Sequence, residues 1–238
     1  MRPDAVLRSS ASHRQRVRFN RGFRWRVGSS IYRCWLGYYE ADKQQLLARL
    51  VKSGMVAYDI GANAGFYTLA LSRMVGQDGC VHAFEPLPDN MRNIRDHLRL
   101  NACKNVVLHQ TAVSDRDGHA CFQIEASNAM GHLTDGGGLR VSTLRLDSVL
   151  DSGGWLQPDL VKLDVEGAES DVLEGARKLL AQGRTIWLIA LHGEEQRQRV
   201  GCMLHEYGYR IFYLDGSEVA SGLIEADEIY ALPEQDGE

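Results

Sequence analysis

The stretch from Met55 to Pro86 limits the fold of this chain more than any other part of the sequence. Its apolar residues form a short run before Gly61 and then recur at helical spacing after Gly65, which predicts a strand, a glycine turn and a helix. A second apolar run follows and ends at Glu85. This order is the first unit of an α/β fold with a doubly wound, mostly parallel sheet, which binds its ligand at the carboxyl ends of the strands.

The turn has the spacing Asp59-x-Gly61-x-x-x-Gly65, which differs from the G-x-G-x-x-G of dinucleotide-binding proteins and disfavours a dehydrogenase. Its two glycines let the backbone approach a ligand. Asp59 suits an ammonium group better than a pyrophosphate, which it would repel. Glu85 follows Gly65 by about 20 residues, where an acid accepts the hydroxyls of a ribose. These features favour S-adenosylmethionine as the ligand, and the alternative is a tight strand-to-helix turn without a ligand.

The composition is that of one globular domain: 238 residues, 44% hydrophobic and 24% charged. The five cysteines are scattered without a C-x-x-C pair, so neither a disulfide framework nor a zinc site is indicated, and the histidines show no metal spacing. We therefore predict no metal site. No apolar run reaches 18 residues and no signal-peptide pattern is present, which predicts a soluble, cytoplasmic protein without a membrane span.

The first 33 residues contain nine arginines and one aspartate, although the whole chain has a net charge of −4. Arginine alternates with apolar residues from Arg16 to Arg26, which is compatible with an edge strand or with a contact to a polyanion. The alternative is a solubilising tail that pairs with the acidic body, and we favour it because no nucleic-acid-binding motif accompanies the arginines. We predict a basic arm over residues 1–36 and a single domain over residues 37–238.

Beyond the first two strands, the apolar pattern predicts further strands over residues 106–113, 159–165, 185–191, 209–214 and 228–232. Between the third and fourth strands, alternating segments at Ala120–Ala126 and Leu139–Leu146 predict a β-hairpin insertion. Its glycine-rich tip runs from Asn128 to Gly138. The tip is either a lid over the ligand or an inert surface loop.

Four polar residues lie at the carboxyl ends of predicted strands: Asp59, Glu85, Asp164 and His192. This edge is where the architecture binds its ligands, so the four residues indicate a site. Lys162 shares a strand face with Asp164 because the two are two residues apart. Either it takes part in the site, or it forms a buried ion pair that only fixes the strand.

The chain resembles the FkbM family of S-adenosylmethionine-dependent methyltransferases in four motifs that occur in order: DIGANAGFYT, AFEP, AVSD and PDLVKLDVEGAE. The resemblance extends from about Gly37 to His192. It implies a class I (Rossmann-like) methyltransferase fold. The activity it implies is O-methylation of a hydroxyl on a sugar, a glycan or a secondary metabolite.

The resemblance also implies roles for individual residues. Those that would bind the cofactor are Glu40, Asp59, Gly61, Ala62, Asn63, Gly65, Glu85, Pro86, Ala112 and Ser114. Asp164, Glu166 and His192 would face the methyl group and the acceptor. One departure is Ala190, which stands where the family often has an acid before this histidine.

We predict direct in-line attack of the acceptor hydroxyl on the methyl group, with Asp164 or His192 accepting the proton. His192 is the preferred base because the ordinary pKa of histidine lies nearer neutrality. Two readings from other classes stay open: a nucleic-acid-associated protein that uses the arginine arm, and an S-adenosylmethionine-binding module without catalysis.

Overall fold

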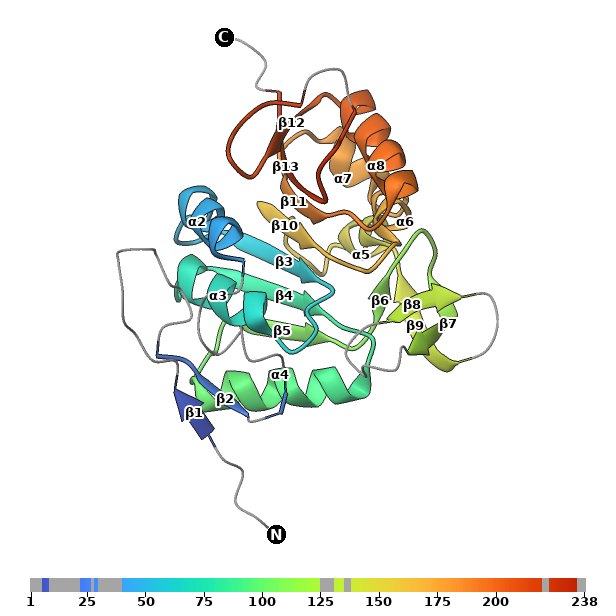
Figure 1. The fold of residues 1–238 in the computed structure, drawn as a ribbon. Helices are drawn as coiled ribbons and strands as arrows, with labels where there is room; N and C mark the ends of the chain where they lie inside the picture. The colour runs from blue at the N-terminus through green and yellow to red at the C-terminus, as the bar shows by residue number, and fades with distance from the viewer. Residues whose placement is uncertain are drawn as a thin grey trace.

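The computed structural model describes residues 6–8, 22–26, 28–29, 40–124, 131–134, 138–219 and 223–234. Within this part of the chain the main sheet has the strand order β12-β13-β11-β10-β3-β4-β5 (Figure 1). In that order, its strands are Tyr209–Tyr213, Glu228–Pro233, Ile186–Ala190, Leu160–Leu163, Val56–Ile60, Cys80–Phe84 and Val106–His109. The strands from β11 to β5 pair in parallel, and β13 is antiparallel to both of its neighbours. The predicted doubly wound, mostly parallel sheet is confirmed.

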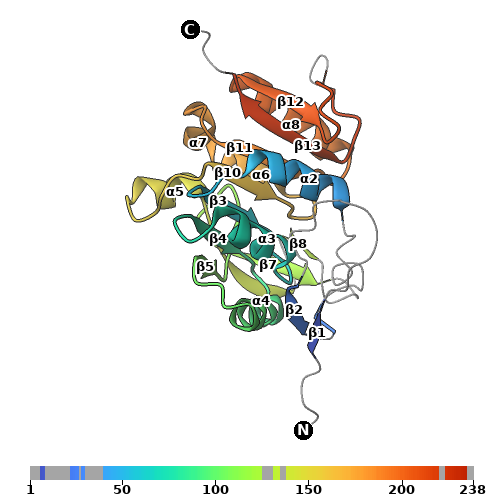
Figure 2. The ribbon, with the colours of Figure 1, turned by 90° about the vertical axis from the view of Figure 1, so that its left-hand side faces the viewer.

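Helices cover both faces of this sheet (Figure 2). One face packs against α2 (Ala41–Leu50), α3 (Phe66–Val75) and α4 (Pro88–Leu100). The other packs against α5 (Leu146–Asp151), α6 (Glu169–Glu174), α7 (Arg177–Ala181) and α8 (Glu194–Glu206). None of the helices in the described ranges is long and apolar enough to cross a membrane.

The alternation of side chains along β3 explains why the sheet is apolar on both sides. Tyr58 and Ile60 pack into the core beneath α6 to α8, whereas Ala57 packs into the core beneath α2 and α3. Successive residues of a strand point to opposite faces, so a strand covered on both sides is apolar at every position. Asp59 and Lys162 break this rule on the face of α2 and α3, and they belong to the site described below.

A smaller sheet lies beside the main one, and two sequence predictions are corrected there. The strand predicted over residues 106–113 is two strands: β5 ends at His109, and β6 (Ala112–Val113) pairs with the second sheet instead. The chain turns between them because the Thr111 N–H donates to the His109 carbonyl and its hydroxyl donates to the Ser142 carbonyl.

The insertion holds three strands rather than a simple hairpin. β7 (Gly118–Ile124) pairs antiparallel with β9 (Leu139–Leu144), as the alternating segments predicted. An additional strand, β8 (Gly131–Thr134), pairs with the outer edge of β7. Residues 128–130 and 135–137 of the predicted tip lie outside the described residues. Its role as lid or inert loop therefore stays a prediction.

The described part of the basic arm packs on the domain. β1 (Val6–Arg8) and β2 (Arg24–Arg26) form an antiparallel pair beside α4 (Figure 1). The Trp25 side chain is fully buried, stacked on Phe66 and edge-on to His97. Arginine alternates with buried aromatic residues here because one side of the strand faces the core.

The boundary at residue 36 between arm and domain stays a prediction. Residues 30–39, which join β2 to α2, lie outside the described residues. Arg26 forms an ion pair with Asp96 of α4 at 3.0 Å, so at least residues 23–26 behave as part of the domain.

Candidate active site

The predicted site residues lie at one edge of the main sheet. Glu85 directly follows β4, Asp164 directly follows β10, and His192 lies two residues beyond β11. Asp59 lies inside β3, one residue before its end. The four strands are neighbours in the order β11-β10-β3-β4, so their carboxyl ends form one continuous edge. This is the ligand edge that the architecture predicts.

Two positions of the turn after β3 require glycine because of their backbone conformation and their close neighbours in the protein. Gly61 and Gly65 have φ values of 77° and 87°, in the left-handed region that favours glycine. A Cβ on Gly61 would lie 1.8 Å from the carbonyl oxygen of Asp164, and a Cβ on Gly65 would lie 3.2 Å from Ile94. The Cβ side of Gly61 is thus occupied by the end of β10, and the approach of the turn to a ligand stays a prediction. The turn and the end of β10 are packed against each other.

Glu85 is a buried residue whose carboxylate is fixed by hydrogen bonds from other residues of the protein. It accepts hydrogen bonds from the backbone N–H of Asn63 at 2.8 Å and of Leu87 at 2.9 Å, and from the side-chain amide of Asn90 at 3.2 Å. Burial raises the pKa of Glu85 to about 7, against these hydrogen bonds, which lower it. A carboxylate has about four acceptor positions, so one remains for a ligand hydroxyl.

Asp59 is fully buried, and both of its carboxylate oxygens lie close to other side chains of the protein. It accepts a hydrogen bond from the Thr68 hydroxyl at 2.6 Å, and its other oxygen lies 3.5 Å from Nζ of Lys162. Lys162 also lies 3.5 Å from Asp164 and donates to the Gly61 carbonyl at 3.2 Å. This placement favours an indirect role for Asp59 beneath the turn, and its assignment to the cofactor stays a prediction.

Glu40 belongs to a second buried ionic group, which the sequence did not reveal. Lys43 is almost fully buried and pairs with Glu40 at 2.8 Å and with Glu228 of β13 at 2.6 Å. The Tyr67 hydroxyl donates to Glu40. Nζ of Lys43 and Nζ of Lys162 lie 5.4 and 5.2 Å from the centre of the Tyr67 ring. The ring therefore connects the two ionic groups.

Ala112 is the first residue of β6 and Ser114 directly follows this strand, where the small sheet meets the main one. The Ser114 side chain is buried, and its N–H donates to the Leu144 carbonyl of β9. The structure leaves their contact with the cofactor, and that of Ala62 and Pro86, as predictions.

Asp164, Glu166 and His192 come together as the resemblance implied. Nε2 of His192 lies 3.3 Å from Glu166 and 3.8 Å from Asp164. Nδ1 of the same ring lies 2.8 Å from Glu169, whose side chain is fully buried. Each ring nitrogen of His192 thus faces a carboxylate.

The pKa values in this cluster follow from the contacts. The hydrogen bond to Glu169, assisted by the charges of Glu166 and Asp164, raises the pKa of His192 to about 9, although burial lowers it. Burial raises the pKa of Asp164, but Lys162, Lys43 and His192 outweigh burial and hold that pKa below its ordinary value.

Sequence reasoning missed Glu169 as a site residue. It opens α6 three residues after Glu166, and acids are common in the first turn of a helix, so its position alone gave no signal. Its partner His192 comes from a different strand. Only the pairing of β10 with β11 brings the two together.

A histidine pair lies on the other side of β4. Nδ1 of His82 lies 3.0 Å from Nε2 of His109, and the His109 ring stacks on Trp155 at 4.1 Å. Burial lowers the pKa of both rings, that of His109 to about 4. The pair is therefore neutral at pH 7.

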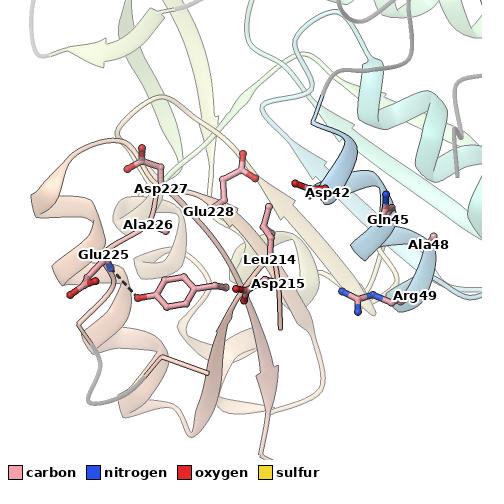
Figure 3. Close-up of a pocket in the computed structure, with 11 residues that line it drawn as sticks. Asp42, Gln45, Ala48, Arg49, Leu214, Asp215, Glu225, Ala226, Asp227 and Glu228 are labelled. Atoms are coloured by element: carbon pink, nitrogen blue, oxygen red, sulfur yellow. Dashed lines mark hydrogen bonds between the residues drawn. The ribbon is translucent and has the colours of Figure 1, made fainter. Parts of the chain in front are cut away.

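A cavity lies between α2 and the ends of β12 and β13 (Figure 3). Asp42 and Arg49 line it from α2, and the acids on the opposite side are Asp215, Glu225, Asp227 and Glu228. Glu228 also pairs with Lys43, so this acidic groove adjoins the ionic group of Glu40. The catalytic candidates are not among its lining residues.

The residues at the strand ends fit S-adenosylmethionine. Glu85 offers a buried acceptor at the end of the second strand, beside a left-handed glycine turn to which Asn63 ties it. The acids Asp164 and Glu166 suit the positive charge of a sulfonium or an ammonium group. Within the fold, Gly61, Asn63 and Glu85 would hold the cofactor, and the cluster of Asp164 would lie beyond it.

Known proteins are similar to this chain over much of its length. Residues 59–211 match the family model described as the methyltransferase FkbM domain. The hexuronic acid methyltransferase AglP of Haloferax volcanii is 27% identical, over 70% of this chain and 68% of its own length. The 2-O-methyltransferase NoeI of Sinorhizobium fredii is 28% identical, over 60% of this chain and 66% of its own length.

Among solved structures, methyltransferase FkbM from Methylobacillus flagellatus superposes with a TM-score of 0.53 at 16% identity. The match covers 74% of this chain but 43% of that protein. The chain thus spans about two thirds of the curated relatives' length and less than half of this solved structure. The likeness supports the methyltransferase fold.

Proposed function

Because this chain belongs to the FkbM methyltransferase family, we propose that it transfers a methyl group from S-adenosylmethionine to a hydroxyl oxygen of a sugar-type acceptor. The observation that carries the proposal is the meeting of Asp164, Glu166 and His192 beside the glycine turn. The acceptor class rests on the names of the two relatives, one acting on a hexuronic acid and one methylating a 2-hydroxyl.

The bound cofactor would supply a methyl group that is already activated by the positive sulfur. The chain has to align the acceptor with it and accept one proton. A hydroxyl placed against Asp164 would donate its hydrogen to that carboxylate. The ring of His192 has carboxylates at both nitrogens, which favours an orienting role for the ring and a proton-accepting role for Asp164 or Glu166.

The remaining partner and location assignments are part of the same proposal. The acceptor is a small molecule or a glycan, and no nucleic acid takes part. The reaction takes place in the cytoplasm, as the sequence predicts.

The test offers isotope-labelled S-adenosylmethionine and a panel of uronic acids, neutral sugars and their glycosides to the purified protein. Labelled methyl ether on a sugar hydroxyl supports the proposal, and its position is read by NMR. Asp164→Asn and Glu166→Gln should each lower kcat roughly 10²-fold to 10⁴-fold while the cofactor Kd is retained. Glu195→Gln on α8 is the control, since this exposed acid lies outside the cluster.

Tight cofactor binding without turnover on any hydroxyl acceptor would instead identify a binding module. Full rate in His192→Asn, with loss in Asp164→Asn, would assign the base to Asp164. Loss in His192→Asn together with loss of the ascending limb of the pH profile would favour the ring as base, as the sequence suggests.

A further inference from the structure

We propose that Asp164, Glu166 and His192 bind a divalent cation of the Mg²⁺ or Mn²⁺ type, which holds the acceptor hydroxyl. One ligand atom from each of the three side chains lies within 4.8 Å of the others. The three residues follow two neighbouring strands, and all are partly exposed at the ligand edge. The role toward the acceptor rests on the proposed methyl transfer, whereas cation binding does not.

The spacing suits a small cation. Neighbouring ligands of an octahedral ion with bonds of about 2.1 Å lie about 3 Å apart. Nε2 of His192 lies 3.3 Å from Oε2 of Glu166 and 3.8 Å from Oδ1 of Asp164. Small side-chain rotations bring all three atoms to bonding distance. Carboxylates suit Mn²⁺ and Mg²⁺, and an imidazole suits a transition metal, so the set favours Mn²⁺ and leaves positions for solvent or substrate.

A fourth residue prepares the histidine as a ligand. Glu169 is fully buried, and its Oε1 lies 2.8 Å from Nδ1 of His192. The same oxygen accepts the N–H of Gly167 at 3.0 Å, which fixes its position. A carboxylate on Nδ1 holds the proton there and directs the lone pair of Nε2 outward, which is the arrangement found behind metal-bound histidines. Nε2 faces the two other carboxylates, so a cation bound between the three side chains would take the place of the proton on Nε2.

The negative charge of the cluster also favours the binding of a cation. Asp164, Glu166 and Glu169 bring three carboxylates to one histidine ring. The ammonium group next to Asp164 is that of Lys162, and it is shared with Asp59 and buried behind the site. A divalent ion in front of the ring would offset the remaining negative charge, because opposite charges attract strongly in a partly buried site.

The cation gives the cluster a chemical role. A hydroxyl bound to it has a lowered pKa, so the acceptor oxygen becomes a better nucleophile. The O–H bond breaks and its proton passes to the Glu166 carboxylate, which is partly exposed to solvent. An O–CH₃ bond forms as the S–CH₃ bond breaks, and that electron pair stays on sulfur. A sugar with two adjacent hydroxyls would occupy two open positions, which favours sugar diols among the acceptors.

The test measures Mn²⁺ binding to protein freed of metal by a chelator, using electron paramagnetic resonance of the free ion. We expect one specific Mn²⁺ per chain in the wild type, and affinity reduced at least 10-fold in both Glu166→Gln and His192→Asn. Glu169→Gln should weaken binding roughly 10-fold to 100-fold without removing a ligand. Asp42→Asn in the acidic groove is the matched control and should bind Mn²⁺ like the wild type. Circular dichroism and cofactor calorimetry on each variant identify those that fail to fold.

Three results separate this inference from the proposed function. Mn²⁺ affinity that falls in Asp42→Asn but not in Glu166→Gln or His192→Asn would overturn the cation site. Methyl transfer that proceeds at full rate in excess chelator would overturn the role of the cation toward the acceptor, while leaving the proposed function intact. Specific Mn²⁺ binding without S-adenosylmethionine binding would leave the cation site standing and contradict the methyl transfer.

Discussion

Asp59 and Lys162 stand opposite each other on the parallel strands β3 and β10, with 3.5 Å between Oδ1 and Nζ and both side chains buried. Asp164 and Asp59 together raise the pKa of Lys162 above its ordinary value, although burial lowers it. The lysine therefore stays charged, and it links the strand beneath the glycine turn to the strand that carries Asp164.

Replacing Lys162 by methionine should lower the free energy of unfolding by about 3–5 kcal/mol, because two carboxylates lose their buried partner. Urea unfolding followed by circular dichroism measures the change. Lys178→Met is the control: this lysine pairs with Asp151 on the surface, so its loss should stay within about 0.5 kcal/mol. Equal stabilities for the two variants would contradict a structural role for the buried pair.

Replacing Glu85 by alanine should weaken S-adenosylmethionine binding by about 1.5–3 kcal/mol, because the ribose loses a charged acceptor. Isothermal titration calorimetry gives the Kd. Asp89→Asn, an exposed neighbour in the first turn of α4, should bind the cofactor as the wild type does. An unchanged Kd in Glu85→Ala would remove the ribose assignment.

The protein should lose stability as the pH falls from about 6.5 toward 4, in part through the histidine pair. The pKa of His109 is lowered to about 4, so the unfolded chain takes up a proton in this range that the folded chain does not. The contribution of His109 to stability is complete above the pKa of this ring in the unfolded chain. It is lost as the pH falls through the lower pKa of the ring in the folded protein. The loss is at most about 3 kcal/mol, and solvent screening reduces it because the ring is partly exposed.

The variant His109→Phe, which keeps the stack on Trp155, isolates this contribution. Its melting temperature should fall less than that of the wild type between pH 7 and pH 4.5. Parallel curves for the two proteins would show that other groups govern the acid response.

Shortening the tip from Asn128 to Gly138 should raise the acceptor KM or abolish turnover while the cofactor Kd holds. The change removes β8 but keeps the pairing of β7 with β9, which reaches Phe122 and Leu139. Steady-state kinetics and calorimetry on the same variant measure the two effects. If neither the KM nor kcat moves, the tip is an inert loop.

Replacing Trp25 by alanine should cost about 3–5 kcal/mol of stability, because the ring is fully buried against Phe66 and His97. Thermal unfolding measures it. Arg24→Ala on the exposed side of the same strand should change stability by less than about 0.5 kcal/mol. A mild effect of Trp25→Ala would mean that the arm is dispensable for folding.

The ligand edge could be predicted because parallel strands bring their carboxyl ends to one side. Asp164 and His192 are far apart in the sequence, yet each follows an apolar run. This pattern was enough to predict that both lie at the same edge of the sheet. The family resemblance added Glu166. The glycine turn between β3 and α3 could likewise be predicted from the change in apolar spacing, and its cofactor role stays a prediction.

The partners of these residues could not be predicted, because they depend on packing between elements. Lys43 reads as a polar position of a surface helix, and its burial results from pairing with Glu228 in the last strand. The run from Val106 to Val113 gives no sign of its division between two sheets, since both halves are apolar. The spacing of apolar residues predicts which face of a helix or strand is buried, but it does not predict which other element packs on that face.

The contact between Gly61 and the carbonyl of Asp164 joins the turn after β3 and the end of β10 into one rigid unit. Neither segment can be transplanted into a relative, or exchanged in a chimera, without the other, because any side chain at Gly61 would push the aspartate backbone away. Engineering a new acceptor preference should therefore leave both segments intact and vary the inserted sheet, whose strands meet the main fold through β6.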